Sequence, residues 1–157
     1  VTGESPVEER DSAVQGMIEN HIDVIFDSNA STTAKELQTA EKEGVWMIVP
    51  ESGKDFVIPK TVLCTLFTRI DRGAYEVVKR TAEGHFEGGL LELGLAEGAV
   101  GYLDPNGNLS LSMKQLADSF AAAILSGNII VPDSREEFEG FFVPQEGLLP
   151  QEERPVG

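Results

Sequence analysis

Residues 22–49 read IDVIFDSNASTTAKELQTAEKEGVWMIV, and this stretch decides the fold. It begins with a short apolar run and ends with a nearly continuous one over residues 45–49. Between the two runs, Thr33 and Glu36 have the spacing of a capping box, which predicts the start of a helix. Gly44 is a natural left-handed terminator for that helix. A strand, a helix and a second, fully apolar strand are typical of a parallel sheet buried on both faces.

The same alternation of helix and strand patterns continues on both sides of this stretch. Before it we expect a helix from a capping box at Ser5 to about Asn20, and after it a strand over residues 62–67. A helix over residues 71–83 follows, with Ala74, Val77 and Val78 facing inward and Gly84 as its stop. The remaining expected elements are a glycine-rich β-like stretch over residues 88–104, a helix capped at Ser112 and stopped by Gly127, and a short strand over residues 128–131. This order predicts an α/β fold with an open, mostly parallel sheet, right-handed crossovers and helices on both faces.

The chain of 157 residues has room for one domain, or for one lobe of a two-lobed protein. We expect the α/β lobe to cover residues 1–132. The composition then changes, and residues 133–157 form an acidic, proline-rich tail. In that tail the aromatic rings that are able to dock on the lobe are Phe138, Phe141 and Phe142.

The chain is strongly acidic, since 27 acidic against 12 basic residues give a formal net charge of −15. Such a field repels phosphate backbones and anionic lipid surfaces, so we expect no binding of nucleic acid or of a membrane surface. The single cysteine, Cys64, excludes an intrachain disulfide and a cysteine-cluster metal site. No apolar run reaches the ~18 residues of a membrane span, and residues 1–20 lack a basic-then-apolar signal pattern.

The sequence lacks the motifs of the common enzyme classes. It has no Walker loop and no G-x-S-x-G elbow, and Cys64 lies in an apolar run without an activating neighbour. Residues 104–108 begin like a calcium loop but lack its later glycine and glutamate, so we expect a turn there. His21 and His85 stand alone, without metal-ligand spacing. The sequence therefore predicts a protein that is not an enzyme and that holds no metal or cofactor.

Polar loops follow three of the expected strands, at the sheet edge where open α/β folds bind their ligands. These loops are residues 27–31, 51–53 and 68–69, and they offer carboxylates, small hydroxyls and backbone amides at a helix start. Such groups suit a ligand with several hydroxyls. Ordinary caps and turns have the same composition, so the pattern alone leaves both interpretations open.

Several segments spread over residues 7–132 share their order and spacing with one known family. They are DVIF at 23–26, EGVWMI at 43–48, VL at 62–63 with RID at 69–71, GHFEGG at 84–89, LGLAEGAVG at 93–101 and SGNIIVP at 126–132. The last three look like the family segments GKFKGG, LGLKEGGVG and SGEIKVP. By these segments the chain resembles the basic membrane protein (BMP) family, the nucleoside-binding lipoproteins of ABC transporters.

The resemblance implies a type I periplasmic-binding-protein fold, in which two α/β lobes joined by a hinge hold the ligand between them. The chain corresponds to the later part of such a protein, mostly its second lobe. The implied partners are therefore a nucleoside-like small molecule, the missing first lobe or another protein chain (a second copy included), and an ABC transporter permease. The implied location is extracytoplasmic, either membrane-anchored or periplasmic.

The resemblance also implies four ligand-binding positions. Phe26 matches the family aromatic that stacks on the nucleobase, although a core residue at a strand end is the alternative for this ring. Ser31 belongs to the pair that stands in place of the family diglycine. Glu51 falls on the ribose-binding aspartate, and Thr68 falls on a family lysine, with Arg69 beside it. A carboxylate at Glu51 without that lysine favours a ligand with hydroxyl donors or a positive charge and repels nucleotides.

Two functions from different classes follow from these observations. The first is a BMP-type solute-binding protein that recognises a nucleoside-like or other polar small molecule for ABC-type uptake, without catalysing a reaction. The alternative is a diverged interaction or regulatory module that keeps the fold and pairs with another chain. The ordered family segments favour the first function, whereas the replacements at Ser31, Glu51 and Thr68 favour the second.

Overall fold

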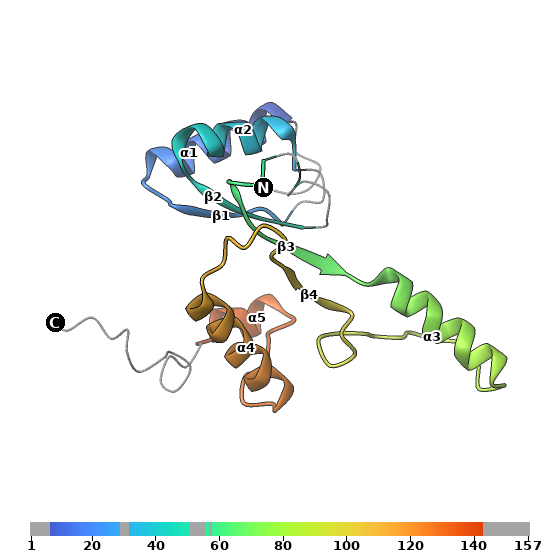
Figure 1. Cartoon of the computed structure of the whole chain (residues 1–157). Coiled ribbons are helices and arrows are strands. Elements are labelled where there is room, and N and C mark those ends of the chain that lie inside the picture. Colours follow the sequence, from blue (N-terminus) through green and yellow to red (C-terminus); the bar gives the residue numbers. More distant parts are fainter. Residues whose placement is uncertain (1–6, 29–31, 51–55, 57, 143–157) are drawn as a thin grey trace. The chain divides into compact units, whose positions relative to one another are not determined.

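The computed structural model describes residues 7–28, 32–50, 56 and 58–142 (Figure 1). It divides into two compact units, residues 1–108 and residues 109–157. Unit 1 holds the sheet and three helices, and unit 2 holds two further helices.

A four-stranded sheet with the order β1-β2-β3-β4 forms the centre of unit 1. The first three strands run parallel, and the last pairs antiparallel with its neighbour. This arrangement confirms the predicted open, mostly parallel α/β sheet. The strands are β1 (Val24–Phe26), β2 (Trp46–Pro50), β3 (Val62–Thr68) and β4 (Val100–Leu103).

Two helices, α1 (Val7–Glu19) and α2 (Ala34–Glu43), pack against each other on one face of the sheet (Figure 1). The core of unit 1 lies between these helices and the parallel strands. Met47 and Val49 of β2 lie in one cluster with apolar residues of these helices and are almost completely buried. The buried core residues are Val14, Ile25, Leu37, Ala40, Val45, Met47, Val49, Ile58 and Val62.

Both ends of α2 are fixed by the residues that the sequence predicted for them. The Thr33 hydroxyl accepts a hydrogen bond from the backbone amide of Glu36, and the Glu36 carboxylate accepts one from the backbone amide of Thr33. Gly44 closes the helix in the left-handed conformation, with φ 73°. The capping box and the terminator are therefore confirmed. The capping box fixes the residue at which the loop after β1 ends and α2 begins.

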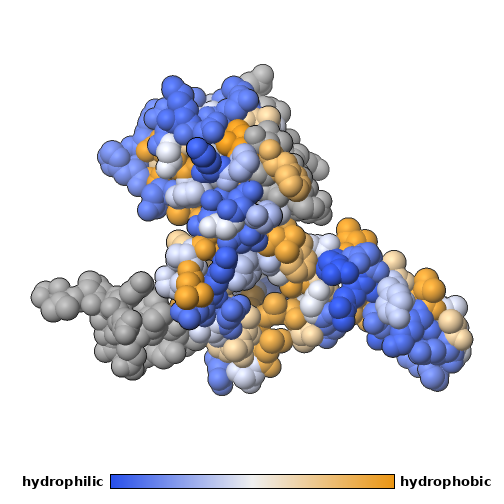
Figure 2. Space-filling view, viewed as in Figure 1, coloured by the Kyte–Doolittle hydropathy of each residue, from blue (hydrophilic) through white to orange (hydrophobic). Residues whose placement is uncertain are grey.

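The third helix, α3 (Ile70–Ala82), differs from its prediction in burial rather than in position. We predicted Ala74, Val77 and Val78 to face inward, but α3 has no buried residue. Val77 is 41% exposed and Val78 is 67% exposed. The prediction was wrong because an amphipathic pattern shows which face of a helix is apolar, not whether that face has a partner. Figure 2 shows apolar side chains of α3 at the surface.

The pairing of β3 with β4 places an aromatic ring over a glycine. Phe67 and Gly101 are direct cross-strand partners. A Cβ atom at Gly101 would lie 2.7 Å from the Phe67 Cζ atom, which is closer than atoms can approach. The ring therefore occupies the space that a side chain at Gly101 would need, an arrangement known from other sheets in which an aromatic residue covers a glycine.

Unit 2 contains α4 (Leu111–Leu125) and the short α5 (Arg135–Glu139). The hydroxyl of Ser110, not of the predicted Ser112, caps α4 by accepting a hydrogen bond from the Met113 amide. The predicted strand over residues 128–131 does not form, although Ile129 is buried. In the described part of the tail Phe138 and Phe142 are mostly exposed, so the predicted docking of these two rings is not seen.

Candidate functional site

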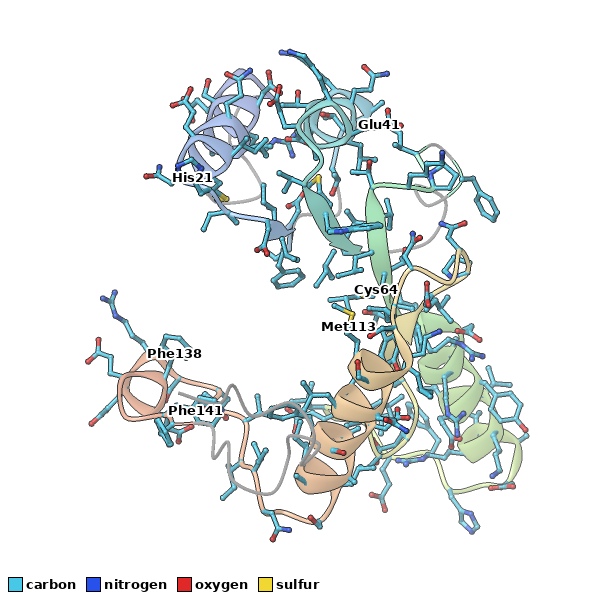
Figure 3. All side chains as sticks on the ribbon, turned by 60° about the vertical axis from the view of Figure 1, so that its left-hand side comes forward. His21, Glu41, Cys64, Met113, Phe138 and Phe141 are labelled. Carbon is cyan, nitrogen blue, oxygen red and sulfur yellow. The ribbon has the colours of Figure 1, made fainter. Side chains whose placement is uncertain are left out.

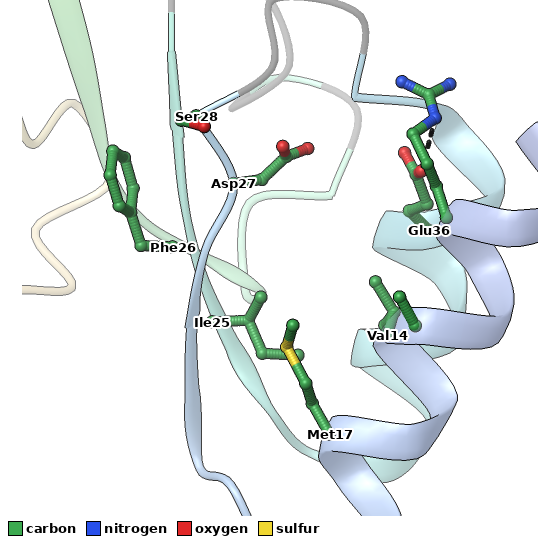
Figure 4. A pocket seen from close by; sticks show the side chains of 9 residues that line it. Val14, Met17, Ile25, Phe26, Asp27, Ser28 and Glu36 are labelled. Carbon is green, nitrogen blue, oxygen red and sulfur yellow. Dashed lines mark ion pairs between the residues drawn. The ribbon is translucent and has the colours of Figure 1, made fainter. Parts of the chain in front are cut away.

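A cavity of about 170 Å³ lies at the carboxyl end of β1, where the strand approaches α1 and α2 (Figure 4). Its position agrees with the rule that open α/β sheets bind ligands at strand carboxyl ends. Apolar side chains from α1 and β1 line one part of it, and charged and hydroxyl groups line the other. The lining residues are Arg10, Ala13, Val14, Met17, Ile25, Phe26, Asp27, Ser28 and Glu36.

The polar part of this cavity is held by contacts between α1, α2 and the loop after β1. The Thr32 hydroxyl donates to the Asp27 carboxylate at 2.6 Å. The Glu36 carboxylate, which caps α2, also pairs with Arg10 of α1, with 3.5 Å between Arg10 Nε and Glu36 Oε1. The Arg10 and Glu36 side chains are only 9% and 2% exposed. This buried ion pair joins the two helices directly behind the loop.

The strand-end position Phe26 is exposed, not part of the core. Its ring is 59% exposed, whereas the preceding Ile25 is 4% exposed. Since successive strand residues point to opposite faces, the Phe26 ring lies on the side of β1 away from α1 and α2, as Figure 4 shows. Of the two roles that the sequence left open for this ring, its exposure excludes a place in the core.

Of the other three predicted ligand-binding residues, only Thr68 is among the residues that the structure describes. Ser31 and Glu51 lie outside the described residues. Thr68 is exposed at the end of β3. Phe26 pairs in register with Ile48, and Ile48 with Cys64, four residues before Thr68. At strand spacings of about 4.8 Å and rises of about 3.3 Å per residue, the Phe26 and Thr68 backbones are roughly 16 Å apart. A ligand held by both residues would have to span that distance.

Arg69, which stands next to Thr68, has a carboxylate partner of its own. Its guanidinium donates to both oxygens of Asp71, with Nη2 2.7 Å and Nε 2.8 Å from the nearer oxygens. These hydrogen bonds raise the pKa of Arg69 and lower the pKa of Asp71. The sequence placed Arg69 beside Thr68 at the expected ligand-binding edge. The structure shows its guanidinium paired with Asp71 at the start of α3.

No metal or reactive-thiol site is found among the residues that the structure describes. They contain no cluster of three or more side chains able to hold a metal ion. Cys64 lies within β3 and is 7% exposed, and burial raises the pKa of its thiol (Figure 3). A thiol that stays protonated is a poor nucleophile. Within the described ranges, no helix is both long and apolar enough to cross a membrane.

Sequence reasoning missed two charged residues of the cavity, Arg10 and Glu36, of which Glu36 was identified only as a helix cap. Asp27 belongs to the loop that the sequence placed at the ligand-binding edge. The pairing of Arg10 with Glu36 joins residues on different helices, and a single sequence carries no signal for it. For Asp27, the signal was its place directly after a strand that ends at the ligand-binding edge.

Comparison with known proteins identifies the family of this chain. A model of the Bmp family, described as ABC transporter substrate-binding protein PnrA-like, matches residues 7–135. The chain belongs to the Bmp family. This result confirms the resemblance stated from the segments at residues 23–132, and the Bmp family is one of substrate-binding proteins.

The relatives of this Bmp-family chain are longer proteins. Basic membrane protein A of Borreliella burgdorferi is 26% identical over 138 residues, and the match covers 83% of this chain and 40% of the relative. An uncharacterized lipoprotein of Pyrococcus abyssi is 31% identical over 68 residues, which are 43% of this chain and 16% of that protein. The chain thus spans less than half the length of these curated relatives.

Two solved structures share the fold of this Bmp-family chain. The first is a solute-binding protein of an ABC transporter system from Aeropyrum pernix, with a TM-score of 0.61 and 20% identity. The match covers 83% of this chain and 46% of that one. The second is a transcriptional activator of the comK gene from Bacillus halodurans, with a TM-score of 0.68, 14% identity and coverage of 80% and 44%. At such identities the likeness shows the fold alone.

Proposed function

We propose that this chain is the ligand-binding lobe of a Bmp-type solute-binding protein that recognises a nucleoside-like or other polar small molecule for ABC-type uptake. The observation that carries the proposal is the exposed Phe26 ring at the carboxyl end of β1 in a Bmp-family lobe. An exposed aromatic ring at this edge suits stacking on a flat heteroaromatic group. The role needs no catalytic group, which agrees with the sequence.

The other predicted contacts complete this proposal. In the sequence Ser31 comes after β1 and Glu51 directly after β2, and Thr68 is the last residue of β3; the three residues offer hydroxyls and a carboxylate. These groups suit the hydroxyls of a sugar, and the carboxylate disfavours a phosphate. A permease of an ABC transporter is the partner expected for uptake. One relative is described as a lipoprotein, which supports our proposal of a location outside the cytoplasm, anchored to a membrane or in a periplasm.

Titration calorimetry of the chain with adenosine, inosine, uridine and cytidine tests the proposal. We expect at least one of these nucleosides to bind and adenosine 5′-monophosphate not to bind. Replacing Phe26 by alanine should weaken the binding about 5- to 150-fold, since stacking on an aromatic side chain contributes about 1–3 kcal/mol per base.

The matched control for this titration is Phe86→Ala, because Phe86 is 60% exposed, close to the value for Phe26. It should leave the affinity unchanged. If the chain bound none of the four nucleosides, the nucleoside part of the proposal would fail. Equal losses in the two variants would remove Phe26 from the site.

The apolar face of α3 supports a second polypeptide as a partner. Ile70, Val77 and Val78 follow one another along one side of this helix and are 73%, 41% and 67% exposed. Exposed apolar patches of this kind usually mark a contact with another protein segment. We propose that the rest of a longer Bmp-type protein covers this face, and that a second copy covers it when the chain is alone.

Light scattering of the chain alone therefore should show association that increases with concentration. Val78→Lys should shift the molecules toward monomer, because a lysine ammonium cannot be buried in an apolar contact without a large loss of hydration. The control is Val131→Lys, the same change at a valine that is 59% exposed in unit 2. A chain that stays monomeric at high concentration contradicts the prediction.

The interaction or regulatory module remains the second candidate function. One observation favours it: the exposed apolar face of α3 suits a contact with another chain whether or not a small molecule binds. The net charge of −15 opposes direct contact with DNA, so such a module would act on another protein. A chain that binds no small molecule but still associates through α3 would support this function over the first.

A further inference from the structure

Unit 2 contains a groove between the chain that follows α4 and the short helix α5. Its volume is about 560 Å³, against about 170 Å³ for the cavity at the end of β1. Every residue that lines the groove lies in unit 2, whereas Phe26 and Thr68 of the proposed solute site lie in unit 1. The groove is therefore separate from the proposed solute site, and neither depends on the other.

The turn after α4 forms the floor and one wall of the groove. Gly127 takes the left-handed conformation, with φ 76°, and the amides of Asn128 and Ile129 both donate to the Ala123 carbonyl. These bonds end the helix and turn the chain back. Ile129 is 7% exposed as a result, and the next residue, Ile130, is 78% exposed. Ile129 thus lies at the floor of the groove and Ile130 at its open side.

The helix α5 and the residues after it form the other wall. The helix ends at Gly140, and the Phe141 amide then donates to the Phe138 carbonyl in a turn. Half-buried Phe141 (Figure 3) and the 80% exposed Phe142 both line the groove. The groove therefore has large apolar side chains open to water on both of its sides. Exposed apolar surface of this kind usually marks a contact with another polypeptide.

The family match does not account for this groove. The Bmp model matches residues 7–135, so it includes the turn after α4 but ends at the first residue of α5. The wall that carries Glu136, Glu137, Phe141 and Phe142 lies beyond the matched residues. The groove thus combines a segment that the family shares with one outside the family match.

The charged side chains of the groove are acidic. Glu136 and Glu137 line it, and its described lining contains no basic side chain. The neighbouring Arg135 is paired within α5, with 3.2 Å between its Nε and Glu139 Oε1. The Glu137 carboxylate accepts the neutral Asp133 amide at 3.3 Å, which leaves its charge in place. Both the groove and the whole chain, at −15, therefore favour a cationic partner.

We propose that this groove binds an extended segment of another protein that carries apolar side chains flanked by lysine or arginine. The apolar side chains of that segment pack on Ile129 between Ile130 and Phe142, and its cations face Glu136 and Glu137. Apolar burial supplies most of the affinity, since exposed ion pairs contribute little, and the charges select the partner. A second copy of this acidic chain does not fit that charge pattern.

The test uses three hexapeptides with blocked ends: GKFLKG, GEFLEG and GKSSKG. Each is titrated into the full chain at pH 7 and followed by the amide signals of the ¹⁵N-labelled protein. We expect GKFLKG to bind at least fivefold more tightly than the other two, because GEFLEG lacks the cations and GKSSKG lacks the apolar side chains. The signals that move should be those of residues 127–142.

A pair of phenylalanine variants tests the apolar contact. Phe142→Ser removes an apolar side chain from the groove and should weaken the binding of GKFLKG at least threefold. The matched control is Phe138→Ser, since Phe138 is 67% exposed and does not line the groove. It should leave the affinity for GKFLKG unchanged. Equal losses in the two variants would remove Phe142 from the binding site and overturn the proposal.

A pair of double variants tests the charges. Glu136→Gln with Glu137→Gln should reduce the preference for GKFLKG over GEFLEG to less than twofold. The control is Glu92→Gln with Asp118→Asn, which removes the same net charge from two exposed carboxylates outside the groove. The control should keep the full preference. An equal reduction in both double variants would show attraction to the charge of the whole chain and overturn the proposal.

The peptide results also separate the groove from the proposed solute site. No binding of GKFLKG, or equal binding of GKFLKG and GKSSKG, overturns the groove proposal whether or not a nucleoside binds. Binding of GKFLKG that depends on Phe142 and on the two glutamates supports the groove even if the chain binds no nucleoside. Saturating adenosine should leave the affinity for GKFLKG unchanged, and displacement of the peptide by adenosine would overturn the proposal of a separate site.

Discussion

Replacing Glu36 by glutamine is expected to lower the free energy of unfolding by about 3 kcal/mol, because breaking a buried ion pair from one side leaves an uncompensated charge. Glutamine keeps an oxygen that accepts the Thr33 amide, so the helix cap survives the change. Arg10, whose side chain is 9% exposed, then loses the charge of Glu36. Urea unfolding followed by circular dichroism measures the difference.

The double variant Arg10→Met with Glu36→Gln distinguishes this cause from lost packing. Removing both charges eliminates the uncompensated guanidinium, so the double variant should be more stable than Glu36→Gln alone. Replacing a buried pair by apolar groups is often neutral or stabilising. If Glu36→Gln costs less than about 1 kcal/mol, the pair is no more important than an exposed ion pair.

Replacing Gly101 by alanine should also destabilise unit 1, by about 1–3 kcal/mol, the usual cost of adding a methyl group where the space is filled. The new Cβ would lie 2.7 Å from Phe67 Cζ, so the ring has to leave its place over the β3–β4 pair. Phe67→Leu in the same chain removes the ring atoms that clash. The double variant should therefore lose less stability than the sum of the two single changes.

Gly16→Ala is the matched control for this glycine. Gly16 lies within α1, and a Cβ atom there would have no heavy atom within 4 Å. Alanine is the better helix former by about 0.8–1.0 kcal/mol, so this variant should be more stable than the natural chain. A stabilising Gly101→Ala would mean that the Phe67 ring does not occupy the space above the glycine.

The parts of the fold that local chemistry specifies were predictable from the sequence. Thr33, Glu36 and Gly44 act within one turn of each end of α2, and the structure has all three in their predicted roles. The parallel pairing of β1 with β2 followed from the strand, helix and strand pattern of residues 22–49. The helix α3 was placed correctly, but its burial was not, because burial depends on what lies across from the helix.

The candidate site was predictable only in part. The sequence identified the strand-end loops and Phe26, whose exposure depends on which face of β1 it occupies. Two ion pairs, Arg10 with Glu36 and Arg69 with Asp71, show why the rest of the site could not be predicted. The first joins distant residues that only the fold brings together. The second depends on the conformation at the start of α3, which directs the guanidinium to its own helix.

The place of β1 at the end of the strand order has a consequence for how ligands act on this lobe. A short outer strand separates from its neighbour in local opening events that leave the centre of the sheet intact, whereas β2, bonded on both sides, opens with global unfolding. Phe26 and Asp27 both belong to the end of β1. A ligand held there suppresses the local opening first, so slower amide exchange in β1 would report binding at ligand concentrations too low to raise the melting temperature.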